Sequence, residues 1–307
     1  MIDRKSPHNP NVASGQARPP APIRAMFRIA GLLAPEAVGS YVGRKMFRPR
    51  RLGGPAATPH ATLGVQKIAL PHRDTALNLH AWGSGSRIVL LVHGWEGDIR
   101  DMSEFIMPLL RQNFRVLALE LPAHGASGAS ETDVHDAAAA IGAAAENCGP
   151  LHSIVAHSLG GAAATVFLSE HSGAARLVLV APGGDLGQDI RRLSSALALP
   201  ERASAALSRY VSARYGRSLE ECSTARAAKS VHIPALIFHD LADRITPFAE
   251  AQEISRSFLQ GRLVPTSGLG HRRILKDADV ISLTVEFLAG GLLAAADETA
   301  VPLNAVA

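Results

Sequence analysis

The sequence predicts an α/β protein whose mostly parallel sheet is interrupted by a block of helices. Short apolar runs of strand length recur over residues 62–290, and segments with helical spacing separate most of them. Residues 183–230 abandon this alternation and have the composition of two or three helices. Parallel strands need crossover connections, which are usually helical. The alternation therefore indicates βαβ units with a helical insertion.

The chain begins with a polar and basic region. Residues 1–21 are polar with a Pro-rich end, and we expect them to be disordered. Apolar residues recur at helical spacing over 23–47, and the pattern breaks at Pro35, which predicts two short amphipathic helices. We assign residues 1–52 to a basic N-terminal extension. Its helices are expected to pack on the core through four apolar anchors, namely Phe27, Leu33, Tyr41 and Phe47.

From Ala61 onward, strands and helices alternate. The run RIVLLV is apolar after its first residue and is typical of a strand buried on both faces of a sheet. Strands are expected at 61–70, 76–82, 87–95, 114–122, 151–158, 176–182, 233–240 and 261–267. Helices are expected at 98–112, 133–146, 159–171, 247–259 and 277–290.

The charge is divided unevenly along the chain. The formal net charge is +4, but residues 1–52 contain ten Lys and Arg against Asp3 and Glu36, which leaves the remainder at −4. A basic region can bind nucleic acid or an anionic membrane surface. Because the basic residues are not interleaved with aromatic residues, nucleic acid is not an expected partner. Weak contact of residues 22–52 with a membrane surface stays open.

Cysteine content and hydropathy indicate the compartment. Cys148 and Cys222 are the only cysteines, too few for a disulfide framework or a four-thiolate metal site. No apolar run follows a basic start as in a secretory signal, and the longest apolar stretches fall far short of the roughly 20 residues of a membrane span. We expect a soluble, cytoplasmic protein.

The strongest chemical signal is the segment AHSLGG at 156–161, where a strand leads into a helix. A serine on such a sharp turn presents its hydroxyl at the carboxyl edge of the sheet. The turn needs small residues two positions before and after Ser158, which here are Ala156 and Gly160. The alternative interpretation is a serine that only caps the helix.

Two further motifs favour chemistry at Ser158. HGWEG, at 93–97, follows the buried strand, and GLGH places His271 in a glycine-flanked loop after the last strand. Asp243 lies between the two, in the turn after strand 233–240. The chain order Ser158, Asp243, His271 is the order expected of a Ser…Asp…His triad on this type of sheet.

These motifs resemble those of the α/β-hydrolase superfamily, and the resemblance covers roughly residues 62–290. Gly is the usual residue where this chain has Ala156. The resemblance implies an eight-stranded, mostly parallel sheet flanked by helices, with a helical lid inserted after the sixth strand. That lid corresponds to residues 183–230 of a hydrolase domain spanning 53–293, and a C-terminal tail follows at 294–307.

The resemblance also implies the roles of individual residues. Ser158 would be the nucleophile, His271 the base and Asp243 the residue that orients it. Asp240 and Asp185 are alternative acids. The backbone N–H groups of Trp95 and Leu159 would form the oxyanion hole, and four neighbours would shape the site: His93, Gly94, His157 and Gly160. No metal or organic cofactor is expected.

The function predicted from this set is hydrolysis of a carboxylic ester with a small or medium acyl group, through an acyl-enzyme. A serine aminopeptidase, thioesterase, acyltransferase or carbon–carbon bond hydrolase would use the same machinery. A non-catalytic ligand-binding or scaffold protein is the alternative of another class. The arginines of the insertion either contact an anionic part of the substrate or are solvated. The physiological substrate and the oligomeric state do not follow from the sequence.

Overall fold

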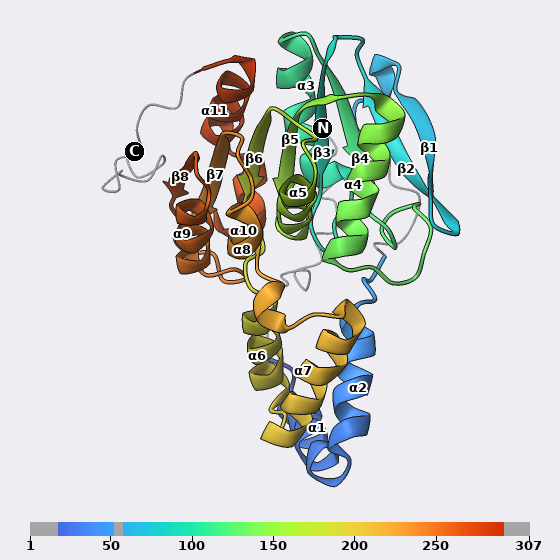
Figure 1. The fold of residues 1–307 in the computed structure, drawn as a ribbon, viewed down its shortest axis with the longest axis vertical. Helices are drawn as coiled ribbons and strands as arrows, with labels where there is room; N and C mark the ends of the chain where they lie inside the picture. Colours follow the sequence, from blue (N-terminus) through green and yellow to red (C-terminus); the bar gives the residue numbers. More distant parts are fainter. Residues whose placement is uncertain (1–17, 52–57, 292–307) are drawn as a thin grey trace, which may run out of the picture.

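An eight-stranded sheet forms the centre of the structure, a computed structural model that describes residues 18–51 and 58–291 (Figure 1). The strands are β1 (Gln66–His72), β2 (Thr75–Trp82), β3 (Arg87–Val92), β4 (Phe114–Leu119), β5 (Leu151–His157), β6 (Arg176–Val180), β7 (Ala235–Asp240) and β8 (Gly261–Thr266). Their order in the sheet is β1-β2-β4-β3-β5-β6-β7-β8. Only β2 runs antiparallel to its neighbours β1 and β4, and the other adjacent pairs are parallel. The predicted fold class is confirmed.

Helices cover both faces of the sheet. They are α3 (Ser103–Arg111), α4 (Val134–Cys148), α5 (Leu159–Glu170), α8 (Thr224–Ala228), α9 (Phe248–Ser257), α10 (Gly270–Arg273) and α11 (Ala278–Ala289). Leu90 and Val92 of β3 pack into the apolar layer shared with α4, α5, α8 and α9. Val89 and Leu91 pack into the opposite layer with α3 and α11. This alternation explains why the strand sequence is continuously apolar, since successive side chains point to opposite buried faces.

The first strand begins later than the sequence predicts. Residues 61–63 form a 3₁₀ turn, and the first strand begins only at Gln66. His60 (φ 48°) and Gly64 (φ 72°) on either side have left-handed backbone conformations, which extended chain cannot accommodate. The predicted disordered start falls mostly within residues 1–17, and the predicted tail at 294–307 falls within 292–307. Both lie outside the described residues.

Four helices form a separate bundle at one end of the sheet, which we call the helical module (Figure 1). These are α1 (Ala21–Leu33) and α2 (Pro35–Met46) from the N-terminal region, and α6 (Leu186–Leu197) and α7 (Glu201–Tyr215) from the insertion between β6 and β7. The N-terminal helices therefore pack mainly on the inserted helices and not on the sheet. Among the described residues, no helix is both long and apolar enough to cross a bilayer.

The contact between α2 and α7 depends on glycines spaced four residues apart. A Cβ atom at Gly39 would lie 2.6 Å from the Cβ of Ala206, and one at Gly43 would lie 2.3 Å from the ring of Tyr210. Residues four apart share one helix face, so the two glycines open a continuous groove for α7. Apolar spacing does not predict close packing of this kind, because the contact depends on the absence of side chains at Gly39 and Gly43.

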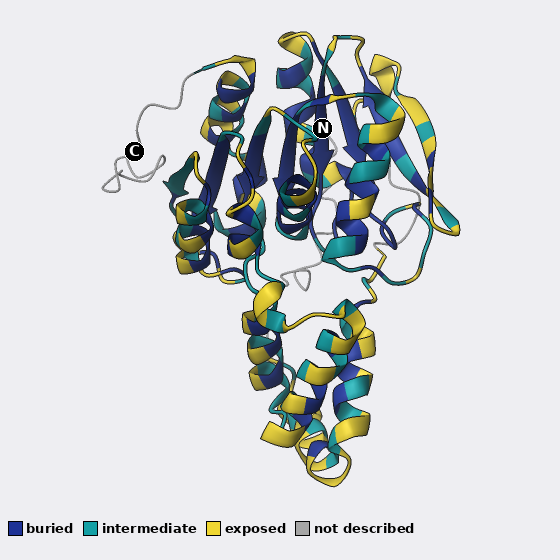
Figure 2. Cartoon of the chain, in the orientation of Figure 1, coloured by how far each residue is buried: buried dark blue, intermediate teal, exposed yellow. Residues whose placement is uncertain are grey.

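Two of the four predicted anchors are correct. Phe47 is buried and Phe27 packs partly buried against the same small core of the module. Leu33 is 81% exposed and Tyr41 is 48% exposed, so neither acts as an anchor. Figure 2 shows where the described residues are buried. Buried residues are concentrated in the sheet, whereas the surface of the module is mostly exposed.

Candidate active site

Ser158 occupies a strained turn between β5 and α5. Its φ of 50° and ψ of −119° are unfavourable for a residue with a side chain, and strain of this kind is typical of functional positions. The Ser158 N–H donates to the carbonyl of Val180 (3.1 Å), which holds the turn against β6. A Cβ at Gly160 would lie 2.4 Å from the carbonyl oxygen of His93, and one at Gly94 would lie 2.9 Å from the Cβ of Ser158. Glycine is required at both positions, because a side chain at Gly160 would meet the backbone of His93 and one at Gly94 would meet the side chains of His157 and Ser158.

The departure from the usual motif, Ala156, is accommodated inside the sheet. It is fully buried in β5, where it pairs with Val92 on one side and Leu179 on the other. Its methyl group belongs to the apolar layer of the sheet. The alanine therefore fills core volume and does not displace the turn at Ser158.

The structure brings Ser158, His271 and Asp243 together from three separate segments. The Oγ of Ser158 lies 3.0 Å from His271 Nε2, and His271 Nδ1 lies 2.7 Å from Asp243 Oδ2. The other oxygen of Asp243 accepts hydrogen bonds from the N–H groups of Ile245 (2.8 Å) and Thr246 (3.1 Å). One carboxylate oxygen is thus fixed by the turn after β7, and the other faces the imidazole.

Asp243 stays ionised although it is buried. Burial by itself would raise its pKa, but the hydrogen bond and charge interaction with His271 and the backbone N–H of Ile245 outweigh burial and hold the pKa below its usual range. A carboxylate acceptor at Nδ1 leaves Nε2 of a neutral His271 without a proton, so Nε2 can accept one from Ser158.

The two alternative acids have other roles. Asp240 accepts hydrogen bonds from the Thr266 hydroxyl and the Leu269 N–H, both at 2.9 Å, and so joins the ends of β7 and β8. Asp185 accepts from the N–H of Gln188 (2.7 Å) and caps α6. Asp243 is therefore the acid that the structure places against His271.

Trp95 and Leu159, the two predicted oxyanion donors, line the same cavity as Ser158. Leu159 is the first residue of α5, and Trp95 lies in the loop after β3. Neither N–H donates a hydrogen bond to another of the described residues. The loop is shaped by Glu96, which has a φ of 52° and whose N–H donates to His124 Nε2 (3.0 Å). An oxyanion hole requires free backbone donors of this kind, and the role of these two N–H groups stays a prediction.

Two buried histidines beside the site, His93 and His157, have fixed hydrogen-bond partners. His93 donates from Nδ1 to the carbonyl of Gly94 (2.8 Å) and accepts at Nε2 from the N–H of Leu121 (3.1 Å), which fixes its tautomer. His157 donates from Nε2 to the carbonyl of His271 (2.9 Å) and so positions the segment that carries His271. Burial lowers the pKa of both imidazoles.

Two further histidines were not singled out by the sequence analysis. His124 packs edge-on against the Trp95 ring, and burial lowers its pKa to about 3. His239 donates to the carbonyl of Thr246 (2.9 Å) and lies 3.5 Å from Asp243 Oδ2, and burial lowers its pKa as well. His124 belongs to the segment ELPAHGASG at 120–128, which resembles a loop of the α/β-hydrolase superfamily, and His239 lies within the predicted strand 233–240.

Ser158 lines a cavity of about 450 Å³ between the sheet and the helical module. Its apolar wall combines residues of the hydrolase core with residues of the module: Leu159, Val166 and Ile245 from the former, and Met46, Phe47, Leu186 and Tyr215 from the end of α2 and the insertion. Met46 and Phe47 were missed as site residues, because nothing in the sequence connects the N-terminal extension to the turn at Ser158.

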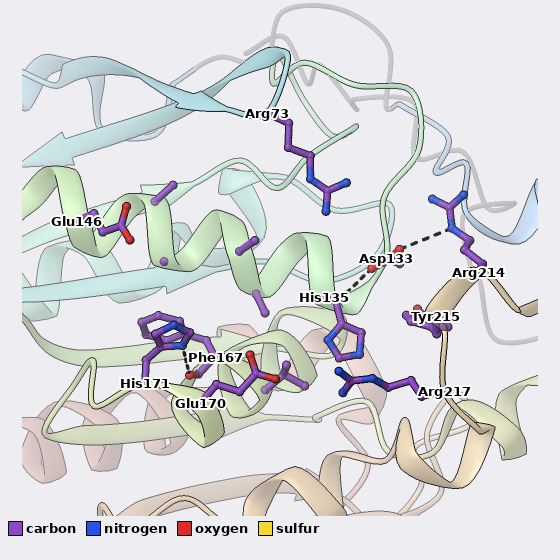
Figure 3. A pocket seen from close by; sticks show the side chains of 15 residues that line it. Arg73, Asp133, His135, Glu146, Phe167, Glu170, His171, Arg214, Tyr215 and Arg217 are labelled. Atoms are coloured by element: carbon purple, nitrogen blue, oxygen red, sulfur yellow. Dashed lines mark hydrogen bonds and ion pairs between the residues drawn. The ribbon is translucent and has the colours of Figure 1, made fainter. Parts of the chain in front are cut away.

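A polar groove of about 800 Å³ adjoins this cavity along α4 and α5 (Figure 3). The groove and the cavity share six lining residues, which are Asp133, His135, Val166, Glu170, Tyr215 and Arg217. Of the insertion arginines, Arg192 and Arg214 form ion pairs with the core, whereas Arg217 lines the shared opening. Ion pairing was not among the predicted fates of these arginines, and contact of an arginine with an anionic part of the substrate stays a prediction.

The order of the strands, the sharp turn at Ser158 and the arrangement of Ser158, His271 and Asp243 are together those of an α/β hydrolase. The family model described as alpha/beta hydrolase family matches residues 89–283, and the chain belongs to this family. The AB hydrolase superfamily protein YisY of Bacillus subtilis is 32% identical over 81 residues, which span 26% of this chain and only 30% of that protein.

Solved structures share the fold at low sequence identity. The esterase Pf2001 of Pyrococcus furiosus superposes with a TM-score of 0.63 at 20% identity, covering 78% of this chain and 98% of that chain. A membrane phospholipase A, described as a bacterial virulence factor, superposes with a TM-score of 0.59 at 19% identity, covering 85% of this chain and 94% of that chain.

Proposed function

We propose that this protein is a serine hydrolase that cleaves carboxylic esters of small or medium acyl groups through an acyl-enzyme. The observation that carries the proposal is the continuous hydrogen-bonded line from Ser158 Oγ to His271 (3.0 Å) and on to Asp243 (2.7 Å). The likeness to an esterase and a phospholipase supports the ester class. The apolar wall of the cavity, whose volume lies within the range of ligand sites, suits an acyl chain.

The chemistry follows from the positions of the protons. His271 Nε2 accepts the Ser158 proton as Oγ attacks the ester carbonyl, and the ionised Asp243 stabilises the imidazolium that forms. The N–H groups of Trp95 and Leu159 would bind the oxyanion, and one such donor contributes about 2.7–4 kcal/mol to the barrier reduction. His271 then protonates the leaving alcohol. A water molecule, deprotonated by His271, releases the acid and restores Ser158.

The test combines turnover with covalent labelling. We expect wild-type protein to hydrolyse p-nitrophenyl acetate, butyrate or octanoate and to react with a fluorophosphonate probe at Ser158. The matched control is Ser158→Ala, which removes only the hydroxyl and should lose both signals. Absence of turnover and labelling in folded wild-type protein would refute the proposal. Binding of a ligand without turnover, retained in Ser158→Ala, would instead support a non-catalytic binding protein.

A substrate panel separates the reactions that share this machinery. Esters, thioesters and aminoacyl amides with the same acyl group should be compared by kcat/KM at one pH. The proposal predicts the largest value for the ester and a dependence on acyl length, because the cavity wall is apolar. A larger value for the thioester or the aminoacyl amide would reassign the substrate class while keeping Ser158 as nucleophile.

A further inference from the structure

Helix α1 exposes an apolar face that no other described element covers. Five large side chains are 42–81% exposed along it, namely Ile23, Met26, Ile29, Leu32 and Leu33. Phe27 and the buried Gly31, four residues apart, lie on the opposite side of the helix and face the bundle. The helix is therefore apolar on both sides, although only one side has a partner within the module.

This exposure is concentrated in one place. Among the described residues nine large hydrophobic side chains are exposed, and five of them belong to α1. A sixth, Tyr41, lies on the neighbouring helix α2. Scattered exposed apolar residues are ordinary on a protein surface, but a contiguous group marks an interaction site.

The surroundings of this face are strongly basic. Residues 18–51 and 186–215 contain 13 Lys and Arg against three Asp and Glu, a net charge of +10, so the rest of the chain carries −6. Arg28, Arg44 and Lys45 are exposed and make no ion pair with the described residues. An apolar helix face with cations beside it is the pattern of a helix that lies in the plane of a membrane interface.

We propose that the exposed face of α1, with the cations around it, docks on an anionic lipid bilayer. The charge favours this occupant over a second copy of the chain, since two such modules would repel each other. The preceding residues 1–17 contain only Ile2 and Val12 as branched aliphatic residues, too little to cover five apolar side chains.

Docking through α1 leaves the Ser158 cavity open. No residue of α1 lines that cavity, whereas Met46 and Phe47, which do, are at the opposite end of α2 from the α1–α2 junction. Twelve residues of α2 span about 18 Å. The apolar part of the lipid contact is thus separated from the reacting serine, whereas the cations Arg44 and Lys45 lie at the cavity end of α2.

The test is co-sedimentation of the full-length protein with vesicles of pure phosphatidylcholine or of phosphatidylcholine containing phosphatidylglycerol. We expect binding to the anionic vesicles, weakened at high salt. The variant Met26→Ser/Ile29→Ser/Leu33→Ser should lower the partition coefficient at least tenfold, and Arg28→Gln/Arg44→Gln/Lys45→Gln should remove the preference for anionic lipid. Leu259→Ser, an equally exposed leucine outside the module, serves as the matched control.

Circular dichroism and thermal unfolding of each variant establish that it is folded, so the result does not depend on the proposed esterase activity. Equal binding of wild type and the triple serine variant would overturn the proposal, as would no binding to either vesicle. Sedimentation velocity tests whether a second copy of the chain occupies the face of α1 instead. A wild-type dimer that becomes monomeric in the triple serine variant would assign the face to a second copy. A marked fall in the Tm of the triple serine variant would show that another part of the same chain covers the face of α1.

Discussion

The sheet core and the helical module achieve compact packing by opposite means. In the core, large aliphatic side chains such as Leu90 and Val89 fill the layers on both faces of the sheet. In the module, the contact between α2 and α7 depends on missing side chains at Gly39 and Gly43. Two regions of one chain are thus stabilised by different features: the core by side-chain volume, and the module by close backbone approach.

The two regions also differ in ionisable groups. The core contains the buried histidines around Ser158, whereas residues 18–51 and 186–215 contain no histidine and are dominated by arginine. They meet at the cavity, where Phe47 and Tyr215 of the module face Ser158. The junction is held by Glu131, which pairs with Arg48 (2.8 Å) and Arg214 (3.0 Å).

The largest effect should come from removing the charge of Asp243 in the core. Asp243→Asn keeps the shape but favours the wrong tautomer of His271, so kcat for ester hydrolysis should fall about 10³–10⁴-fold. Asp240→Asn is the matched control, because it lies at the end of the same strand and bonds Thr266 and Leu269 instead. We expect it to lower stability and to change kcat less than tenfold. Equal losses of kcat in both variants would contradict the assigned roles.

The second-largest effect should be a loss of stability of the helical module when the contact between α2 and α7 is overpacked. Gly39→Leu would force side-chain atoms against Ala206 and against the backbone nitrogen of Leu207, 2.6 Å from the new Cβ. Overpacking of this severity costs about 3 kcal/mol. Trypsin should then cut the arginine-rich module faster while the sheet core stays resistant. Ala37→Leu, at an exposed position of the same helix, should leave digestion unchanged.

Acid should destabilise the core. His124 has a pKa of about 3 in the folded protein and about 6.5 when unfolded, so below pH 6.5 the unfolded chain takes up a proton that the folded one does not. Through His124 alone, the free energy of unfolding should therefore fall by about 2 kcal/mol between pH 7 and pH 5.

Urea unfolding at the two pH values checks this acid effect. His124→Gln should be less stable at pH 7 but lose less on acidification than wild type. His232→Gln, at an exposed histidine, should behave as wild type does. A wild-type protein that is equally stable at both pH values would rule out a neutral buried His124.

The smallest effect concerns the junction. Arg214 contacts Glu131 and Asp133 and lies over the Phe47 ring at 4.3 Å, so Arg214→Ala should cost about 1 kcal/mol. Arg209→Ala removes a fully surface-exposed pair with Glu36 and should cost less than about 0.5 kcal/mol. Thermal unfolding measures both. A larger loss for Arg209→Ala would show that the junction does not depend on this network.

By itself the sequence determined the α/β class, the strand and helix positions and the motifs that carry Ser158, Asp243 and His271. These features are encoded locally, because apolar period and small residues at a sharp turn act over a few neighbouring positions. The role of Asp240, three residues from Asp243, could not be decided from spacing, since Asp240 ends the strand and Asp243 lies in the turn directly after it.

The contacts between segments that are far apart in the chain became visible only in the tertiary structure. It placed α1 and α2 on the inserted helices, brought Met46 and Phe47 to the cavity and left Leu33 exposed where an anchor was expected. Apolar spacing shows that a helix is amphipathic but not which partner covers it. The partner here is recognised through the close approach of Gly39 and Gly43 to α7, which depends on residues more than 160 positions away.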